Sequence, residues 1–497
     1  MLPVTVHCRA PEGLDTPEVS VEICLGPGLP GLSIVGLAET AVKESRDRVR
    51  AAIRSSGFDM PDRRIVVNLA PADLPKSGGR YDLAIAIGIL CASGQLPAAQ
   101  LAHCELLGEL ALSGHLRRIP ASLASAMAGL RAGRAVIVPA ACNDEAGLLH
   151  DPQVFTATTL AEVAGYLRGD NTLSTARAYP RPAIETLPDM REVQGQALAK
   201  RALEIAATGR HHLLMSGPPG TGKSMLARRL PGILPPLGTA ELLETAAITS
   251  LRGMAAPHGD EPPFRTPHHS ASAVALIGGC ADPRPGEASL AHHGVLFLDE
   301  LPEFNRQALE MLREPMETGH VSIARARSTV RFPARFQLVA AMNPCPCGYH
   351  GDVHRECRCS ADQVRRYRTR ISGPLLDRID ICVEMGRERI VLQAAAAQTP
   401  TSADVRDRVQ RARERSIARG TTLNADLDSA AVKEWCWPEP AGIELLEQAA
   451  ARFCLSRRAL DRTLRVARSI ADLADADIVT REHVAEALGF RNGVDGL

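Results

Sequence analysis

The sequence predicts an α/β protein in three parts: a mixed α+β domain, an α/β core with a parallel sheet, and a C-terminal domain built only of helices. Short β-type runs alternate with helical patterns up to residue 168, and strongly apolar strand patterns alternate with helices over 189–386. Amphipathic helical patterns then fill 387–497. Between the first two parts, 169–188 opens with small polar residues and carries three prolines, which is typical of an extended linker.

Composition limits the classes of function. With 497 residues, of which 45% are hydrophobic and 23% charged, the chain has ample material for several folded domains. The 57 basic residues balance the 57 acidic ones, so contact with DNA must come from local patches. Aromatic residues, at 3%, are too few for a broad base-stacking surface. The longest strongly apolar run, residues 83–92, is too short to cross a bilayer, so we expect no membrane contact.

In the first domain the runs VEICL, LSIVGL, RIVVNLA and AVIVPA predict strands, and residues 39–56 predict a helix. On that helix one face carries basic residues at helical spacing, namely Lys43, Arg46, Arg50 and Arg54. This basic stripe is a candidate DNA contact. Its alternative is an ordinary solvated helix face.

The strongest motif begins after a predicted strand at residues 212–215. It reads Gly217-Pro218-Pro219-Gly220-Thr221-Gly222-Lys223-Ser224, and a helical pattern follows it. Strand, glycine-rich turn and helix together form a P-loop, in which backbone N–H groups and the helix N-terminus face phosphate oxygens. Lys223 is placed to reach the β- and γ-phosphates of ATP, and Ser224 is placed to bind Mg²⁺. The sequence therefore predicts ATP and Mg²⁺ as cofactors.

Two further apolar runs end in polar residues that suit hydrolysis. Residues 294–298 end in Asp299 and Glu300, a Walker B arrangement. In it Asp299 holds Mg²⁺ through water, and Glu300 deprotonates the attacking water. Residues 336–342 end in Asn343, which is placed to hydrogen-bond the same water. Because the carboxyl ends of parallel strands meet at one sheet edge, we expect these side chains beside the P-loop.

With these motifs in this order the chain resembles the AAA+ ATPases, in which Asn343 takes the sensor 1 position. The segment ISGPLLDRID looks like their arginine-finger segment, and SRR at residues 456–458 looks like the start of the sensor 2 helix. The resemblance implies that Arg378 acts on ATP bound by a neighbouring copy. It also implies that sensor 2 is Arg458, in preference to Arg457.

A homo-oligomer follows from the finger role, because such an arginine serves the nucleotide of another copy. The alternative for Arg378 is an ordinary ion pair with Asp377 or Asp380, which flank it closely in sequence.

Three segments are more specific than the Walker motifs: FRTPHHSASAVALIGGC, DPRPGEASLAHHGVLFLDELPEF and VAAMNPCPCGY. They are similar to the magnesium-chelatase-like branch of the AAA+ proteins, and in particular to the ComM/YifB family. GLPGLSIVGLAETAVKESRDRVRAAIRSSGF in the first domain agrees, so the resemblance covers essentially the whole chain. It implies a hexameric, ATP-driven DNA helicase that promotes branch migration during homologous recombination in natural transformation. Two alternatives stay open: a chelatase-like motor that remodels a protein partner for metal insertion, and a DNA-binding scaffold timed by ATP hydrolysis.

The first domain also resembles the catalytic domain of Lon proteases, through PKSGGRYDLAIAIGIL and LGELALSGHLRRIPASLASAMAGLRAGRAVIVPA. In that register Arg80 stands at the position of the nucleophilic serine, and Leu123 at that of the activating lysine. Neither a nucleophile nor its base is present, so we expect a non-catalytic, Lon-protease-like α+β domain and no proteolysis. Ser77 and Lys76 lie nearby, in a turn that is out of register.

Arginines gather between residues 321 and 370, ten of them against three acidic residues. The run VSIARARSTVRFPARF predicts a β-hairpin with Arg325 and Arg327 at its tip. We assign this tip to DNA phosphates. The alternative is a set of arginines that are solvated or bridge subunits.

Four of the 13 cysteines fall within fifteen residues, namely Cys345, Cys347, Cys357 and Cys359. Four thiolates suffice for a closed zinc site, in which His350 or His354 could replace one of them. Redox-active pairs and uncoordinated thiols are the alternatives. The other cysteines are scattered, and the start MLPVTVHC has no pattern of a secretion signal, so we expect a cytoplasmic protein.

Overall fold

The computed structural model describes residues 3–36, 42, 44–178, 187–254, 259–279, 283–324, 329–387, 400–420 and 422–491. The chain divides into two compact units. The first contains Met1–Pro182, Thr239–Gly259 and Ala324–Phe332, and the second contains Ala183–Gly238, Asp260–Ile323 and Pro333–Leu497. The expected core and the C-terminal helices thus share one unit, and two short core segments belong with the N-terminal region. The boundaries 1–168, 169–188, 189–386 and 387–497 stay predictions.

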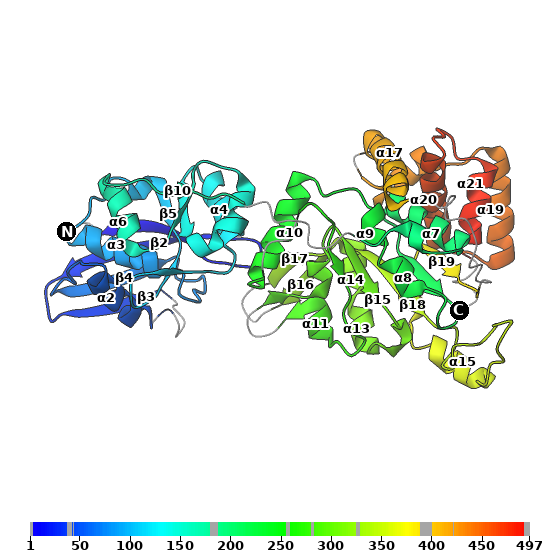
Figure 1. Ribbon diagram of the computed structural model, residues 1–497, viewed down its shortest axis with the longest axis horizontal. Coiled ribbons are helices and arrows are strands. Elements are labelled where there is room, and N and C mark those ends of the chain that lie inside the picture. The colour runs from blue at the N-terminus through cyan, green and yellow to red at the C-terminus, as the bar shows by residue number, and fades with distance from the viewer. Residues whose placement is uncertain are drawn as a thin grey trace. The chain divides into compact units, whose positions relative to one another are not determined.

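The first unit is built on a mixed eight-stranded sheet, of which β2, β3, β4, β5 and β10 are labelled in Figure 1. The order of its strands is β10-β9-β8-β5-β1-β2-β4-β3. Its strands are β1 (Val4–Arg9), β2 (Glu18–Gly26), β3 (Gly31–Val35), β4 (Arg64–Ala70), β5 (Cys104–Leu106), β8 (Ala135–Pro139), β9 (Val154–Ala157) and β10 (Ser174–Thr175). A small hairpin of β6 (Glu109–Leu110) and β7 (Leu116–Arg117) stands apart. The four strands expected from sequence are confirmed as β2, β3, β4 and β8. The short β10 lies inside the range expected to be a linker, and its Ser174 pairs with Thr156.

The helices of this unit are α2 (Ser45–Ser55), α3 (Asp82–Ala92), α4 (Ser122–Arg131), α5 (Asn143–Ala146), α6 (Leu160–Arg168) and α10 (Thr239–Leu251). The most buried of them is α3, which packs on β1 and β2. Because α3 is apolar on every side, it is stable only inside a core. Its Gly88 allows the close approach, since a Cβ there would lie 2.2 Å from Cδ1 of Ile23.

The two positions that match the Lon dyad lie in the interior of the first unit. Arg80 is 2% exposed, and its guanidinium donates hydrogen bonds to Ser125 Oγ and to the backbone carbonyls of Arg9 and Pro120. Leu123 is fully buried in a small apolar cluster between α4 and α10. Lys76 is also buried and donates to the carbonyl of Pro71. Arg80 and Leu123 therefore pack as core side chains where the protease register would need a nucleophile and its base.

The second unit contains a five-stranded sheet in the order β12-β15-β18-β11-β19, in which every neighbouring pair is parallel. Its strands are β11 (Leu213–Ser216), β12 (Phe264–Arg265), β15 (Val295–Leu298), β18 (Gln337–Met342) and β19 (Ile381–Glu384). Alternate side chains enter two cores, because successive residues of a strand point to opposite faces. Leu213 and Met215 belong to the core shared with the C-terminal helices, and Leu214 belongs to the core on the other face. The parallel sheet expected from sequence is thus confirmed.

Short helices and hairpins surround this sheet. The helices are α7 (Ala197–Gly209), α8 (Lys223–Ala227), α9 (Leu230–Ile233), α11 (Ala273–Ile277), α12 (Glu287–Leu290), α13 (Arg306–Met311), α14 (Arg313–Thr318), α15 (Ala361–Arg368) and α16 (Gly373–Leu376). One two-stranded sheet pairs β13 (Gly278–Gly279) with β14 (Arg284–Pro285). Another pairs β16 (His320–Ala324) with β17 (Thr329–Pro333), and most residues of β17 belong to the first unit. The second of these is the hairpin expected from sequence.

The C-terminal region is helical, as expected. It consists of α17 (Ser402–Gly420), α18 (Ser429–Trp435), α19 (Pro440–Phe453), α20 (Arg457–Leu473) and α21 (Arg481–Gly489). In Figure 1 these helices, in orange and red, gather beside α7, and both α17 and α20 pack on α7. The apolar core of one sheet face continues into these helices, so the sheet and the C-terminal helices fold as one body.

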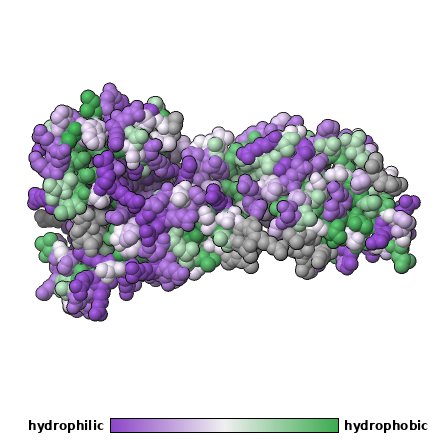
Figure 2. Space-filling view, turned by 180° about the vertical axis from the view of Figure 1, so that it is seen from behind, coloured by the Kyte–Doolittle hydropathy of each residue, from purple (hydrophilic) through white to green (hydrophobic). Residues whose placement is uncertain are grey.

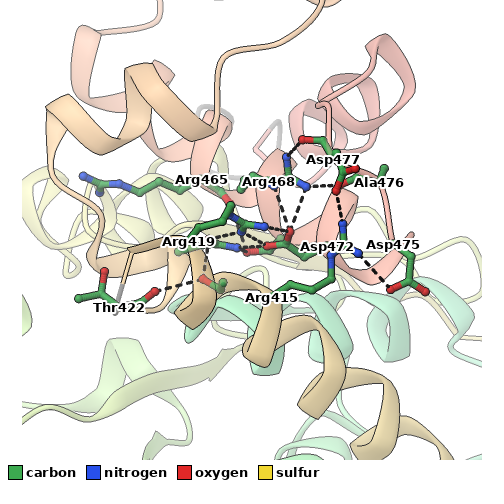
Figure 3. A network of polar contacts seen from close by, with 12 residues as sticks. Arg415, Arg419, Thr422, Arg465, Arg468, Asp472, Asp475, Ala476 and Asp477 are labelled. Atoms are coloured by element: carbon green, nitrogen blue, oxygen red, sulfur yellow. Dashed lines mark hydrogen bonds and ion pairs between the residues drawn. The ribbon is translucent and has the colours of Figure 1, made fainter.

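A buried polar network holds α17 against α20 (Figure 3). At its centre Asp472, 1% exposed, accepts two hydrogen bonds from Arg419, at 2.6 and 2.7 Å, and one from Arg468 at 3.1 Å. Asn424 donates a further bond to the same carboxylate at 2.8 Å. Arg468 is itself 1% exposed, and burial lowers the pKa of its guanidinium. Asp472 therefore supplies the negative charge that lets Arg468 remain buried, and it also pairs with the half-buried Arg419.

Replacing Asp472 with alanine is expected to destabilise the C-terminal helices by about 3–5 kcal/mol, because the buried Arg468 loses its counter-charge. Both tryptophans of the chain, Trp435 and Trp437, lie in this region, so urea unfolding followed by tryptophan fluorescence reports on it. The control is Asp477→Ala, whose side chain is 94% exposed and pairs with Arg415. Equal midpoints for the two variants would contradict a special role of Asp472.

The face of the molecule seen in Figure 2 is mostly polar. On the face seen in Figure 2, hydrophilic residues cover most of the surface and hydrophobic ones form scattered groups. Among the described residues, each helix is either too short or too polar to traverse a bilayer.

Candidate active site

The P-loop connects β11 to α8 and leaves its backbone open on one side. Gly220 and Gly222 adopt φ values of 82° and 89°, a left-handed conformation that favours glycine. A Cβ added at either position would meet no atom within 4 Å, so the space above the loop is free. At Gly217, in contrast, a Cβ would lie 2.3 Å from the carbonyl oxygen of Met385. The three glycines thus allow a tight turn that is open on one side, a cradle of the kind that accepts phosphates.

Lys223 lies across this cradle. Its Nζ donates hydrogen bonds to the carbonyls of Gly217 at 2.6 Å and Pro218 at 2.9 Å, and to Asn343 Oδ1 at 3.2 Å. Burial lowers the pKa of Lys223 to about 8, and the charge of Asp299 opposes this shift. The ammonium is thus largely buried and bonded mostly to neutral oxygens, which is the environment of a lysine suited to a phosphate.

The two residues expected to hold Mg²⁺ meet directly. Ser224 Oγ donates a hydrogen bond to Asp299 Oδ2 at 2.6 Å, although the two come from α8 and from the end of β15. A hydroxyl and a carboxylate beside a phosphate cradle form the oxygen donor set that Mg²⁺ prefers. The residues present therefore fit ATP with Mg²⁺, with Lys223 and the loop N–H groups toward the phosphates.

Glu300 points toward a histidine that the sequence analysis did not single out. It has a left-handed φ of 53°, and its Oε2 lies 3.2 Å from His269 Nδ1. His269 follows β12, the strand beside β15, so both residues come from carboxyl ends at one sheet edge. The HH pair in the segment FRTPHHSASAVALIGGC is the signal that could have found it.

Arg378 and Arg458 lie at the opposite edge of the sheet from the P-loop. They line one cavity of about 590 Å³ together with His212, Phe336 and Asp380. These three residues directly precede β11, β18 and β19, and so mark the N-terminal ends of the parallel strands. The P-loop and Asn343 follow the C-terminal ends of β11 and β18. Within one chain the two arginines are therefore separated from the P-loop by the length of the sheet.

The ion pair of Arg378 is not the one with Asp377 or Asp380 that the sequence left open as an alternative. Arg378 forms an ion pair with Glu317 at the end of α14, whereas Asp377 and Asp380 are not its partners among the described contacts. Asp380 instead lies 3.7 Å from Arg462. Two residues so close to Arg378 in sequence were plausible partners, but Asp380 accepts a hydrogen bond from the N–H of His212 at 3.1 Å.

Of the two candidates for sensor 2, only Arg458 lines this cavity. Arg457 instead forms an ion pair with Asp461 at 3.2 Å, one turn further along α20. Arg458 is exposed, and no ion pair with it occurs within the described part of the chain.

The four clustered cysteines come together. The sulfurs of Cys345, Cys347, Cys357 and Cys359 all lie within 4.8 Å of one another, and three of the separations are 3.4, 3.6 and 3.7 Å. A tetrahedral site with zinc–sulfur bonds of about 2.3 Å needs sulfur separations of about 3.8 Å. The ligand group consists of the four cysteines without His350 or His354. Backbone N–H groups of Arg358 and Tyr349 lower the pKa of Cys347 to about 6, whereas the neighbouring thiols raise the pKa of Cys357 and of Cys359.

The loop that carries these cysteines packs against the P-loop. Gly348 has a φ of 83°, and a Cβ there would lie 2.7 Å from Cδ of Pro219. The loop also forms one wall of a cavity of about 390 Å³, whose other walls include Gly217 and Pro218. The conformation of the cysteine loop and that of the P-loop therefore depend on each other.

The candidate DNA contacts are only partly described. Lys43, Arg325 and Arg327 lie outside the described residues. Arg46 is exposed on α2, 3.6 Å from Asp47, while Arg50 is half-buried with Nε enclosed. The basic stripe is thus less uniform than its spacing indicates.

Family models match three successive parts of the chain. They are "Subunit ChlI of Mg-chelatase" at residues 21–142, "Magnesium chelatase, subunit ChlI" at 189–391, and "Magnesium chelatase, subunit ChlI C-terminal" at 399–491. Together with the parallel sheet, the P-loop and the helical C-terminal region, these matches define a magnesium-chelatase-like AAA+ protein. Membership of this class implies ATPase activity with ATP and Mg²⁺.

Two full-length relatives narrow the class. The YifB protein of Escherichia coli is 48% identical over 489 residues, which are 98% of this chain and 96% of that protein. The competence protein ComM of Haemophilus influenzae is 45% identical over 494 residues, 98% of this chain and 97% of that protein. The chain belongs to the ComM/YifB family. The magnesium-chelatase 38 kDa subunit of Acidiphilium rubrum is more distant, 25% identical over 308 residues, 55% of this chain and 79% of that protein.

Proposed function

We propose that this protein is an ATP-driven DNA helicase that works as a ring of six copies and promotes branch migration during homologous recombination in natural transformation. The observation that carries the proposal is the position of Arg378 and Arg458 at the sheet edge opposite the P-loop. Arginines placed there can serve ATP only when it is bound by another copy. Such a head-to-tail contact, repeated with a rotation that closes, generates a ring. The relation to a competence protein supports DNA as the partner.

In this mechanism bound ATP with Mg²⁺ supplies the phosphoryl group that is transferred to water. Lys223 and the N–H groups of the P-loop hold the phosphates, and Ser224 and Asp299 hold the metal ion. These residues keep the reacting groups in place, which is a large part of catalysis in phosphoryl transfer.

Three further residues act on the water and on the charge that develops. Glu300 takes the proton of the attacking water, and Asn343 orients that water. Arg378 of the next copy stabilises the negative charge that spreads over the transferring oxygens.

DNA is contacted by Arg325 and Arg327 in the pore of the ring, with Lys43, Arg46 and Arg50 as a second basic set.

The test is strand displacement on three-way and four-way DNA junctions, with ATP and Mg²⁺ present. We expect product with the wild type and none with Lys223→Ala, which lacks the phosphate-binding ammonium. Size measurement in the presence of ATP is expected to give six copies. Absence of product with the wild type on every junction would overturn the helicase proposal.

A chelatase-like motor that acts on a protein partner is the second candidate, favoured by the matching family models. The two candidates differ in what stimulates ATP hydrolysis. A DNA motor is stimulated by DNA, whereas a remodelling motor is stimulated by its protein partner. YifB and ComM are matched over nearly their whole length, whereas the chelatase subunit matches only 55% of this chain, so we favour DNA.

We further propose that Cys345, Cys347, Cys357 and Cys359 bind a structural zinc ion. Elemental mass spectrometry is expected to find about one zinc per chain in the wild type and none in Cys357→Ser, because three thiolates leave the site incomplete. The control is Cys24→Ser, which changes an exposed cysteine outside the cluster. Equal zinc contents in the two variants would show that the cluster does not hold the metal.

A further inference from the structure

The cavity lined by Arg378 and Arg458 also contains Glu317, whose carboxylate lies where an anionic ligand would meet the arginines. Six arginines and four acidic residues line this cavity, so basic groups are in excess. Glu317 forms its ion pair with Arg378, and the Arg378 guanidinium lowers the pKa of Glu317. The charges of Arg458 and Arg462 act in the same direction. One carboxylate of the cavity is therefore paired with Arg378 and also stabilised by the charges of two further guanidinium groups.

Other acidic residues of the cavity have arginine partners of their own. Asp426 pairs with Arg210, Asp380 with Arg462, and Asp461 with Arg457 outside the cavity. Among the described contacts, Arg378 has one carboxylate partner, which is Glu317. The side chain of Arg378 is only 10% exposed, and its Nη1 also donates to the carbonyl of Pro374 at 2.7 Å. In the single chain Arg378 is thus held inside its own subunit.

Glu317 is the more exposed partner of this pair. Its side chain is 50% exposed, and it lies near the end of α14, two residues before Gly319, whose φ is 73°. An exposed carboxylate is readily returned to water, whereas a mostly buried guanidinium needs another anion in exchange. The terminal phosphate of ATP carries more charge than a carboxylate and accepts paired hydrogen bonds from arginine.

We propose that Glu317 is a positioning residue that holds Arg378 in the free subunit and is exchanged for the terminal phosphate of ATP bound by a neighbouring copy. This inference rests on the proposed function, in which Arg378 serves that neighbour. Glu317 competes with the phosphate, so each copy engages its neighbour only when a triphosphate is present there. Loss of the terminal phosphate on hydrolysis returns Arg378 to Glu317.

The test compares the steady-state ATPase of Glu317→Gln, Glu317→Asp and the wild type. An ion pair of this exposure contributes about 1 kcal/mol, so removing the competing charge is expected to lower the half-saturating ATP concentration about fivefold. The turnover rate at saturating ATP stays close to that of the wild type. Glu317→Asp keeps the carboxylate and is expected to restore the wild-type half-saturation. The matched control is Glu314→Gln, an exposed residue on the same helix. A lower turnover with unchanged half-saturation would overturn the proposal, because Glu317 would then support the engaged arginine.

A binding measurement separates this inference from the proposed function. With Lys223→Ala present to disable the P-loop, adding Glu317→Gln is expected to raise the affinity for inorganic pyrophosphate about fivefold. Further change of Arg378 to alanine is expected to abolish that gain. If Arg378→Ala alone leaves ATPase activity intact, the shared-site function fails. If Arg378→Ala is inactive but Glu317→Gln shifts neither half-saturation nor pyrophosphate affinity, only the exchange of Glu317 fails.

Discussion

Replacing Arg378 with alanine is expected to lower ATP turnover about 10³-fold or more, while each copy still binds ATP. The arginine lies at the far edge of the sheet from its own P-loop, so its loss leaves the cradle around Lys223 unchanged. The substitution removes a positive charge from the ATP site of the adjacent copy. That charge stabilises the negative charge that develops on the phosphate oxygens during hydrolysis. Two measurements on the same preparation check this expectation. Steady-state ATP hydrolysis measures the loss of turnover, and binding of a fluorescent ATP analogue measures the retained affinity for ATP.

Mixing two inactive variants tests whether neighbouring copies share one ATP site. Arg378→Ala keeps the P-loop and Lys223→Ala keeps the arginine, so an interface between them is complete in one orientation. If the two variants assemble at random in equal amounts, about a quarter of the head-to-tail interfaces have both parts intact, and ATPase activity reappears in that proportion. Arg457→Ala is the control, since Arg457 pairs with Asp461 outside the cavity. Full activity of Arg378→Ala, or no recovery on mixing, would contradict shared sites.

Local motifs explain why much of the site could be predicted from sequence. The P-loop is one continuous segment, and each of Asp299 and Asn343 directly follows an apolar strand. Because all strands of that sheet are parallel, their carboxyl ends had to meet at one edge, and Lys223 indeed bonds to Asn343 while Ser224 bonds to Asp299. Here periodicity and strand direction determine position without knowledge of side-chain packing.

Contacts between distant segments could not be predicted in this way. Nothing in the pattern of α14 shows that Glu317 meets Arg378, because the contact depends on how two helices end beside the sheet. In the same way α10 follows the P-loop helices in sequence but packs on α4 of the first unit, through Ala246 and Ala247. Its apolar residues predict burial but do not specify the partner, and the tertiary fold decides.

Glu300→Gln is expected to lower ATP hydrolysis about 10²- to 10⁴-fold without loss of ATP binding, because an amide cannot accept the proton of the attacking water. Glutamine preserves the size of the side chain and can still bond to His269, which lies 3.2 Å from Glu300 in the structure. The variant should therefore fold normally and retain unhydrolysed ATP. A single-turnover experiment with radiolabelled ATP, followed by separation of protein-bound nucleotide, measures both quantities.

The same variant separates a motor from a scaffold timed by hydrolysis. If hydrolysis drives movement, Glu300→Gln holds DNA but produces no strand displacement and fails to support transformation. If hydrolysis only times release, the variant holds DNA and the biological role survives. Glu303→Gln is the matched control, an exposed carboxylate in the next turn that pairs with Arg370 at 2.8 Å. Because Lys223→Ala loses nucleotide binding as well, retained ATP in Glu300→Gln is the observation that assigns the loss of activity to proton transfer. Hydrolysis by Glu300→Gln at the wild-type rate would remove Glu300 from the mechanism.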